Sequence, residues 1–200
     1  MVFDSDDQQV DELVLEGIVV TMNDDGSPNI SPMGPIVDRA LTRFQLRPYQ
    51  TSQTYINLKR TGAGVFHVID DVLMLARAAV GQLQILPELL PRPAGAGWIL
   101  ADACRWYALR VDELDDSQKR VCIRCSVEEQ GRLRDCFGWN RAKHAVLEAA
   151  ILATRVSLLP GAQILEEFAR LAIAVEKTAG RQEREAMEFL QQYLHQHCRP

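Results

Sequence analysis

Short apolar runs separated by turn signals dominate the first two-thirds of the chain. The run at 12–22 is rich in β-branched residues and stops at the turn sequence Asn-Asp-Asp-Gly, and a second extended run follows at 29–38. Two extended runs on either side of a tight Asp-Gly turn predict an antiparallel hairpin. Pro32 and Pro35 cannot donate ladder hydrogen bonds, so we predict that the second strand is an edge strand or is bulged there.

Four more runs have strand character and bring the predicted number of strands to about six. They lie at 42–47, 65–69, 99–114 and 120–128. Hydroxyl or acidic residues precede the stretches 52–60 and 72–80, which predict short helices. The proline- and glycine-rich segment 86–97 predicts a loop, long enough to be a lid or a partner-contacting arm. Six strands with short helices fit a small β-barrel.

The pattern changes after Gly131. Apolar residues then recur at helical spacing over three stretches, which are 139–159, 163–177 and 182–197. We therefore predict a flexible N-terminal tail at 1–12, a β-barrel domain at 13–130 and a C-terminal helical subdomain at 131–200. The predicted fold class is β-rich α+β, with a six-stranded β-barrel followed by a C-terminal helical bundle.

Composition and charge exclude several classes of function. Hydrophobic residues make up 47% of the chain and charged residues 24%, as is ordinary for a globular domain. The formal net charge of −5 argues against nucleic-acid binding, since general phosphate-backbone binders carry a basic stripe. The N-terminus has no basic start, and no stretch approaches the ~20 apolar residues that span a bilayer. We expect a cytoplasmic protein with no membrane contact.

The cysteines suggest neither a disulfide framework nor a metal site. They are Cys104, Cys122, Cys125, Cys136 and Cys198, an odd number that favours free thiols. Cys122 and Cys125 lie three apart on a predicted strand, where they point to opposite faces and chelate one ion poorly. The sequence holds no nucleophile elbow, no phosphate loop and no HExxH motif. We therefore predict no catalytic side chain and no bound metal.

The proline-interrupted strand is one candidate ligand-binding segment. It comprises Asn29, Ile30, Ser31, Pro32, Met33 and Gly34. Its free backbone groups could hydrogen-bond the edge of an aromatic heterocycle, and Gly34 would permit close approach because it has no Cβ. A bulged edge strand without a ligand is the other interpretation, and the pattern alone favours it.

The start of the helix at 52–60 is a second candidate. Ser52, Thr54 and Asn57 can donate hydrogen bonds to a phosphate at a helix N-terminus, where free N–H groups already favour an anion. Tyr55 belongs to the same segment. A simple capped helix explains these residues equally well.

Arg141 is a third candidate, because it follows the segment that leaves the predicted barrel. With His144, Glu148 and Arg155 it shares one face of a predicted helix. This face could add a cation to the phosphate or to an acidic substrate. An ion-pair network that docks the helix is the other interpretation, and the spacing favours it.

Several stretches carry a resemblance to a known family. They are the hairpin turn, the sequence NISPMGP, the helix start SQTYINL and the strand GVFHVIDD. Together they resemble the FMN-binding split-barrel proteins of the flavin-reductase-like kind. The later stretch GWNRAKHAVLEAAILATR is similar to an uncharacterised branch of that superfamily, domain of unknown function 447. The resemblance covers nearly the whole chain from about Glu12.

The resemblance implies a fold, a cofactor and a place for that cofactor. It implies a six-stranded Greek-key split β-barrel that forms a homodimer, with FMN at the subunit interface. It places the phosphate near the corner Thr54–Asn57 and the isoalloxazine ring along Asn29–Gly34. The chain departs from the better-known reductases in its long helical C-terminus and in lacking a recognisable nicotinamide-binding signature.

Two functions follow as hypotheses. The first is an FMN-binding flavoprotein, a flavin-dependent oxidoreductase or flavin-reductase-like protein whose electron donor and acceptor are unknown. Backbone N–H groups near Ser31–Gly34 would polarise the flavin edge, and hydroxyls near Thr54 would hold the phosphate. The second is a non-catalytic dimeric split-barrel protein that acts as a binding or accessory module, which the family resemblance connects with tetrahydromethanopterin-linked one-carbon metabolism.

Overall fold

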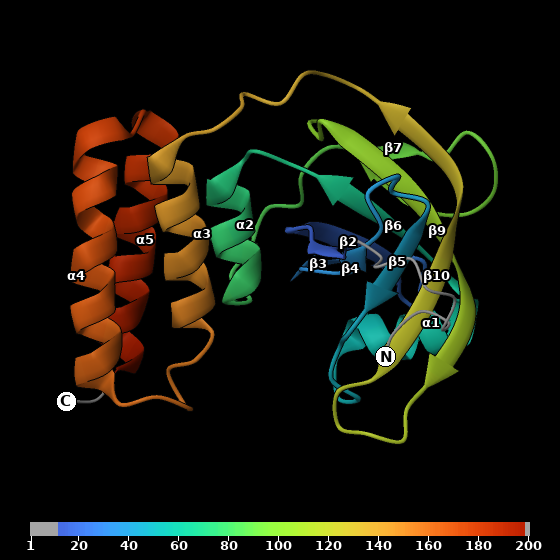
Figure 1. The fold of residues 1–200 in the computed structure, drawn as a ribbon, viewed down its shortest axis with the longest axis horizontal. Coiled ribbons are helices and arrows are strands. Elements are labelled where there is room, and N and C mark those ends of the chain that lie inside the picture. The colour runs from blue at the N-terminus through green and yellow to red at the C-terminus, as the bar shows by residue number, and fades with distance from the viewer. Residues whose placement is uncertain (1–11, 199–200) are drawn as a thin grey trace. The chain divides into compact units, whose positions relative to one another are not determined.

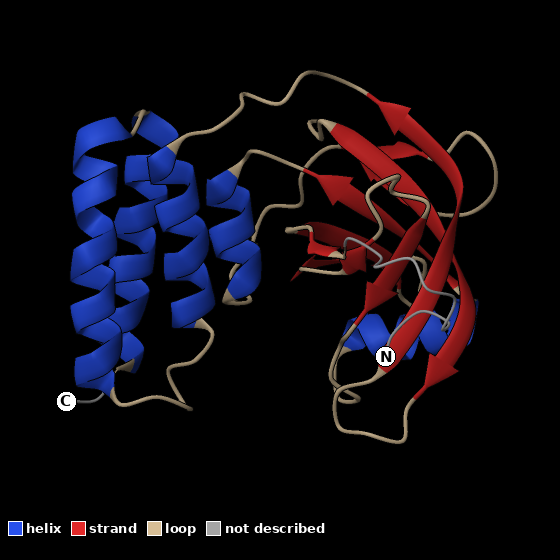
Figure 2. Cartoon of the chain, in the orientation of Figure 1, coloured by secondary structure: helices blue, strands red, loops and turns tan. Residues whose placement is uncertain are grey.

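The computed structural model describes residues 12–198, which divide into two compact units. The barrel unit comprises the chain up to Val68 together with Glu88–Leu133, and the helical unit comprises Ile69–Pro87 and the chain from Arg134. Figure 1 labels the elements of each unit, and Figure 2 separates the strands from the helices. The predicted flexible tail at 1–12 lies, apart from Glu12, outside the described residues.

The barrel unit is built on one antiparallel sheet of eight strands. They are β1 (Leu13–Val14), β2 (Gly17–Met22), β3 (Pro28–Met33), β4 (Ile36–Val37), β5 (Arg43–Leu46), β6 (Ala63–Val68), β9 (Arg105–Asp115) and β10 (Cys122–Arg132). Their order in the sheet is β1-β4-β5-β10-β9-β6-β2-β3. The sheet curls into a half-barrel, and helix α1 (Gln53–Thr61) packs against β2, β3 and β6 (Figure 1).

The first hairpin of the barrel unit is the one that the turn signal predicts. β2 and β3 pair from Gly17 opposite Met33 to Met22 opposite Pro28. In the turn, the N–H of Gly26 donates to the carbonyl oxygen of Asn23 at 3.0 Å, and the φ of Gly26 is +81°, where glycine is favoured. β3 stands last in the sheet order, which confirms that the proline-interrupted strand is an edge strand.

Aromatic packing fills the inside of the half-barrel. The ring of Phe44 lies 5.3 Å from that of Phe66 and 5.4 Å from that of Tyr107, centroid to centroid, and all three side chains are buried. Gly17 lets β2 approach β6 closely, because a Cβ there would lie 2.3 Å from the carbonyl oxygen of His67. These contacts fix the strands that carry the candidate site.

His67 is the one histidine that the described part of the barrel unit buries. Its Nε2 accepts a hydrogen bond from the backbone N–H of Leu100 at 3.2 Å, so the ring is held in its neutral form. Burial lowers the pKa of His67 to about 4. The residue is therefore a core anchor that joins β6 to the segment around Leu100.

The predicted strand count is wrong, and short elements explain the difference. β1 and β4 have two residues each and leave no periodic signal. The segment 86–97, predicted to be a loop, contains β7 (Leu89–Pro91), which pairs with β8 (Trp98–Leu100) in a separate two-stranded sheet. Pro91 is tolerated because β7 has only one neighbouring strand in that sheet.

The helical unit packs four helices around an alanine-rich seam. They are α2 (Val72–Ala79), α3 (Arg141–Ala153), α4 (Gly161–Thr178) and α5 (Arg181–His197). The buried face of α3 consists of Ala142, Ala145, Val146, Ala149, Ala150 and Ala153. Small side chains on this face let α4 and α5 pack closely against α3 (Figure 2). The three predicted C-terminal helices are thereby confirmed.

The division into units differs from the predicted domain boundaries at two places: residues 131–133 belong to the barrel unit, and the segment Ile69–Pro87 belongs to the helical unit. The helix at 72–80 was predicted within the barrel domain, but α2 belongs to the helical unit. Val72, Leu75 and Ala76 of α2 lie in the same buried cluster as the residues of α3 and α5. Local sequence predicts this helix but not the unit that it joins, because its apolar face has no preferred partner until the chain folds.

Candidate functional site

One cavity of the barrel unit gathers most of the predicted ligand-binding residues. Its volume is about 270 Å³, and it is lined by Ser31, Pro32, Met33, Gly34, Arg47, Pro48, Tyr49, Ser52, Thr54 and Arg120. The edge strand β3 and the start of α1 thus converge on one space. The cavity contains backbone and hydroxyl groups from the predicted segments and two arginines that the sequence did not single out.

Four separate parts of the chain supply the cavity wall. β3 and the residue after it provide Ser31–Gly34, the segment after β5 provides Arg47–Tyr49, and the residues at the start of α1 provide Ser52 and Thr54. Arg120 precedes β10 and bridges to Tyr49 across the sheet. Each part is positioned by the sheet or by α1, so the wall does not depend on one long loop.

Ser52 is the N-cap residue of α1, as the sequence predicts. Its Oγ accepts a hydrogen bond from the N–H of Tyr55 at 3.2 Å and donates to the carbonyl oxygen of Tyr49 at 2.8 Å. No acidic residue lies in the first turn of α1. The positive end of the helix dipole therefore meets the cavity without a neutralising carboxylate in that turn.

Thr54 lines the cavity from the first turn of the same helix. It is buried, and its Oγ1 accepts a hydrogen bond from Nδ2 of Asn29 at 3.1 Å. Among the described residues the Thr54 hydroxyl proton has no acceptor, so it is available to a ligand. Asn29 does not line the cavity itself and instead orients Thr54 from behind.

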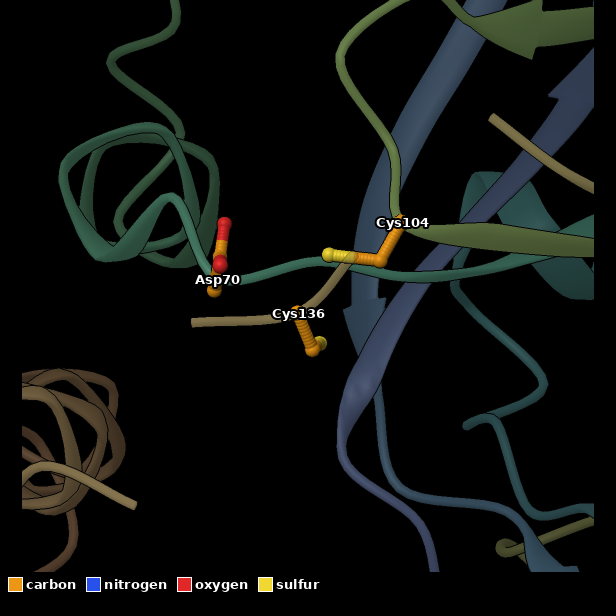
Figure 3. Close-up of side chains that lie close together, drawn as sticks. All are labelled: Asp70, Cys104 and Cys136. Carbon is orange, nitrogen blue, oxygen red and sulfur yellow. The ribbon is translucent and has the colours of Figure 1, made fainter. Parts of the chain in front are cut away.

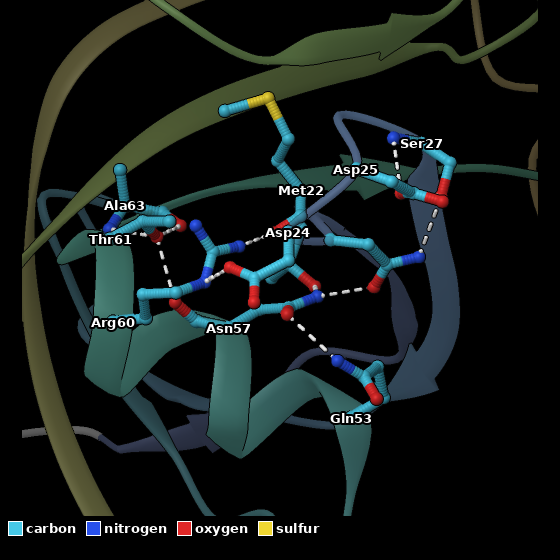
Figure 4. A network of polar contacts seen from close by, with 11 residues as sticks. Met22, Asp24, Asp25, Ser27, Gln53, Asn57, Arg60, Thr61 and Ala63 are labelled. Atoms are coloured by element: carbon cyan, nitrogen blue, oxygen red, sulfur yellow. Dashed lines mark hydrogen bonds and ion pairs between the residues drawn. The ribbon is translucent and has the colours of Figure 1, made fainter.

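Asn57 lies in a buried network rather than in the cavity. Its Nδ2 donates to Oγ1 of Thr21 at 3.0 Å and to Oδ1 of Asn23 at 2.9 Å, and its Oδ1 accepts from Gln53 at 2.9 Å. Figure 4 shows Asn57 between Gln53 and the β2–β3 turn, with Arg60 reaching Asp24 beside it. Asn57 therefore ties α1 to the hairpin and supports the cavity wall indirectly.

The two arginines give the cavity the positive charge that an anion would need. Nε of Arg47 is buried and has no hydrogen-bond partner among the described residues. The guanidinium group of Arg120 lies over the ring of Tyr49, 4.9 Å from its centroid. The cavity lining includes no aspartate or glutamate. Two cations and four hydroxyl-bearing residues in one space are suited to a phosphate group.

The remaining predicted residues lie elsewhere. Ile30 pairs with Val20 in the β2–β3 ladder and is not part of the cavity lining. Tyr55 donates its hydroxyl proton to Asp116 at 2.7 Å, outside the cavity. Arg141 is exposed at the start of α3, in the helical unit. Its suggested contact with a phosphate stays a prediction.

Sequence reasoning missed Arg47, Tyr49 and Arg120. The signal available was local: Arg47-Pro48-Tyr49 directly follows β5, and Arg120 lies two residues before β10. What places them together is the bridge between Tyr49 and Arg120, which are far apart in the sequence. Strand pairing of this kind leaves no mark in the local pattern of either segment.

A second and smaller cavity of the barrel unit lacks charged side chains. Its volume is about 100 Å³, and its lining includes Thr21, Gly64, Gly97 and Trp98. The indole N–H of Trp98 is buried without a hydrogen-bond partner among the described residues. The small size and uncharged lining make this space unsuitable for a phosphorylated ligand.

Three side chains with metal-ligand chemistry are drawn in Figure 3: Asp70, Cys104 and Cys136. Cys104 belongs to the barrel unit, and Asp70 and Cys136 belong to the helical unit, so each is considered within its own unit. The carboxylate of Asp70 accepts hydrogen bonds from Arg134 at 2.5 Å and from the N–H of Phe137 at 2.8 Å. The Arg134 guanidinium group is the main cause of the lowered pKa of Asp70. Asp70 thus already anchors the segment before α3.

The Cys122-x-x-Cys125 pair lies on β10, as predicted. Burial raises the pKa of the Cys125 thiol to about 12, and it also raises the pKa of Cys122. Thiols held in the neutral form are poor metal ligands and poor nucleophiles.

None of the helices in the described part of the chain has the length and apolar character needed to cross a membrane.

Comparison with known proteins identifies related sequences over almost the whole chain. The family described as protein of unknown function (DUF447) N-terminal domain matches residues 15–134. Its companion, protein of unknown function (DUF447), matches residues 140–192. A search of curated proteins finds no match.

Solved structures share the fold at low sequence identity. An FMN-bound DUF447 protein from Methanosarcina mazei is 21% identical, with a TM-score of 0.78 over 92% of this chain and 96% of that one. A nitrilotriacetate monooxygenase component B homologue from Mycobacterium thermoresistibile is 12% identical, with a TM-score of 0.51 over 62% of this chain and 71% of that one. Flavoredoxin from Methanosarcina acetivorans is 10% identical, with a TM-score of 0.50 over 66% and 75%. These likenesses establish a fold similar to the flavin-binding split barrels.

Proposed function

This chain belongs to the DUF447 family, and on that premise we propose that it is an FMN-binding flavoprotein. The proposed molecule is a homodimer with the cofactor at the subunit interface, and its chemistry is flavin-dependent electron or hydride transfer with an unidentified donor and acceptor. A Greek-key connection of the strands and a cytoplasmic location belong to the same proposal. The observation that carries it is the cavity lined by two arginines, four hydroxyl-bearing residues and an edge strand.

The proposed phosphate site combines charge with hydrogen-bond donors. Arg47 and Arg120 supply positive charge, and Ser52 and Thr54 lie at the positive end of α1. An arginine with a buried and unpaired Nε is costly unless an acceptor meets it. A phosphate monoester offers three acceptor oxygens and a charge that both arginines can share. We therefore propose that the phosphate lies at the end of the cavity lined by Arg47, Ser52, Thr54 and Arg120, which we call the phosphate end.

The isoalloxazine ring is proposed to lie along Ser31–Gly34. β3 is an edge strand, so one side of its backbone has no neighbouring strand to bond. A Cβ at Gly34 would lie 2.5 Å from Oε1 of Glu16, the far end of a flexible side chain that can move aside. The bound flavin would supply the redox chemistry, and these residues bind and orient it.

A second subunit is proposed because one chain encloses too little space. The cavity of about 270 Å³ lies below the roughly 300–1,000 Å³ of pockets that bury most of a drug-sized ligand. One chain would therefore cover the phosphate and part of the ring. In the proposed dimer a second copy covers the rest.

The proposal is tested first by colour and then by ligand selectivity. Purified protein should either carry the absorbance of bound flavin or quench FMN fluorescence on titration. Arg47→Gln should weaken FMN about tenfold and leave riboflavin within about twofold, because riboflavin has no phosphate. Arg43→Gln, an exposed β5 residue outside the cavity, is the matched control. If the purified protein is colourless and does not bind FMN in the titration, the proposal is wrong. That result would favour a non-catalytic accessory module.

A further inference from the structure

The turn between β9 and β10 is tied to the segment that precedes α1. The N–H of Gln50 donates to the carbonyl oxygen of Lys119 at 3.2 Å, and the N–H of Val121 donates to that of Pro48 at 2.9 Å. The side-chain amide of Gln50 donates to the carbonyl oxygen of Asp116 at 2.6 Å. These hydrogen bonds hold the β9–β10 turn against the segment before α1, although the turn joins the exposed ends of two long strands.

Asp116 is the hub of a second set of contacts that join the turn to α1. Its Oδ2 accepts a hydrogen bond from the hydroxyl of Tyr55 at 2.7 Å and forms an ion pair with Nζ of Lys59, also at 2.7 Å. Nζ of Lys59 also donates to the Tyr55 hydroxyl at 3.0 Å. The three side chains bond one another pairwise, so each one restricts the geometry of the other two.

The same helix serves the cavity and this cluster. Ser52 and Thr54 line the cavity, and Tyr55 and Lys59 hold Asp116. Four residues after Asp116, Arg120 joins the cavity wall and stacks over Tyr49. The position of Arg120 relative to the hydroxyls of α1 therefore depends on how the turn is held against that helix.

We propose that Asp116 is a positioning residue that sets the preference of the site for a phosphorylated flavin. Asp116 holds the β9–β10 turn against Tyr55 and Lys59 of α1. It thereby fixes Arg120 beside the hydroxyls of Ser52 and Thr54. Arg120 touches the ligand, and Asp116 acts only through it. The inference rests on the proposed function, because it deepens the assignment of the phosphate end.

A merely structural role for the cluster predicts a different result. Exposed ion pairs contribute little to stability, because water screens the two charges. If the cluster only stabilised the fold, its loss would weaken the binding of FMN and of riboflavin equally, or would leave both unchanged. A positioning role instead lowers the ratio of FMN affinity to riboflavin affinity, because only FMN has the group that Arg120 meets.

The experiment compares Asp116→Ala and Lys59→Met with wild type, using FMN and riboflavin as separate ligands in fluorescence titrations. We expect each variant to bind FMN roughly five- to tenfold more weakly and riboflavin within about twofold of wild type. Asp116→Glu, which keeps the carboxylate, should recover part of the selectivity. Glu113→Ala is the matched control, because it removes the ion pair with Arg124 on the same hairpin without touching the cluster.

Arg120→Gln separates failure of this inference from failure of the proposed function. If wild type shows no preference for FMN over riboflavin, the proposed phosphate end is wrong and the inference falls with it. If Arg120→Gln loses the preference but Asp116→Ala keeps it, only the positioning role is overturned. Equal losses of both ligands in Asp116→Ala, accompanied by a lower Tm, would likewise overturn it. Loss of preference in both variants supports the inference.

Discussion

The two units bury polar groups in different ways. The barrel unit buries Thr21, Gln45, Thr54, Asn57 and His67, whereas the described part of the helical unit buries one such residue, Glu183. The helical unit relies instead on the alanine face of α3 and on large apolar residues of α5. Buried polar groups are retained where their geometry matters, because each must find a partner. The buried polar groups therefore gather in the unit proposed to bind the ligand, whereas apolar packing dominates the core of the helical unit.

The largest expected effect tests the packing role of the helical unit. Leu190 of α5 is completely buried in its core. Leu190→Ala should lower the free energy of unfolding by about 2–5 kcal/mol, because it removes buried methyl groups and leaves a cavity. Chemical denaturation measures this loss, and FMN titration of the folded variant should give an unchanged Kd. A variant that stays stable but loses FMN would break the comparison.

The next effect concerns the pH dependence of the barrel unit. The pKa of His67 is about 4 in the folded protein and 6.5 in its ordinary state, because burial penalises the charged ring. Between these two pH values the unfolded chain binds more protons than the folded protein. The contribution of His67 to the free energy of unfolding is therefore fully present above about pH 6.5 and is lost as the pH falls towards 4. The loss should reach about 3 kcal/mol in the free energy of unfolding.

His67→Gln is the control for that pH dependence. The glutamine carbonyl can accept the hydrogen bond from Leu100 but does not titrate in this range. Its unfolding free energy should therefore decline less than that of wild type between pH 6.5 and 4. An equal decline in both proteins would show that carboxylates, not His67, cause the acid sensitivity.

A third prediction separates the wall of the cavity from the network behind it. Asn57→Ala removes the hydrogen bonds of Asn57 with Thr21, Asn23 and Gln53 and should lower the free energy of unfolding by about 1–3 kcal/mol. Thr54→Val removes a hydroxyl that lines the cavity and should weaken FMN more than riboflavin. Thermal unfolding and paired ligand titrations distinguish the two outcomes. Selective loss of FMN binding in Asn57→Ala alone would mean that the phosphate lies nearer to Asn57 than we propose.

How much the sequence predicts depends on the range of the interactions involved. Helices α3, α4 and α5 follow from local apolar periodicity, and the β2–β3 hairpin follows from its turn residues. The convergence of Met33 and Thr54 on one cavity came from the family resemblance, since neither residue signals the other. Local rules succeed where an element carries its own start, end and face.

The features that were missed depend on pairing between distant segments. Arg47 and Arg120 enter one cavity because Tyr49 bridges to Arg120, and nothing in either segment announces that pairing. The sequence predicts that Asn57 donates a hydrogen bond to a phosphate near the N-terminus of α1. The structure instead places it in the network between α1 and the β2–β3 turn (Figure 4). A polar side chain at a helix start can serve a ligand or the fold, and only its neighbours decide which.

The smallest expected effect concerns charge on the surface of the helical unit. Arg170 of α4 pairs with Glu166 at 2.6 Å and with Glu167 at 3.0 Å, and its side chain is 63% exposed. Because water screens exposed pairs on a helix, Arg170→Ala should change the free energy of unfolding by no more than about 0.5 kcal/mol. Lys143→Met is the matched comparison, because it breaks the ion pair with Glu183, whose side chain is 8% exposed. That variant should cost more, since it leaves a shielded carboxylate without its cation. If denaturation shows equal losses in the free energy of unfolding for the two variants, the Lys143–Glu183 pair adds no specific stability. Apolar packing alone would then stabilise the helical unit.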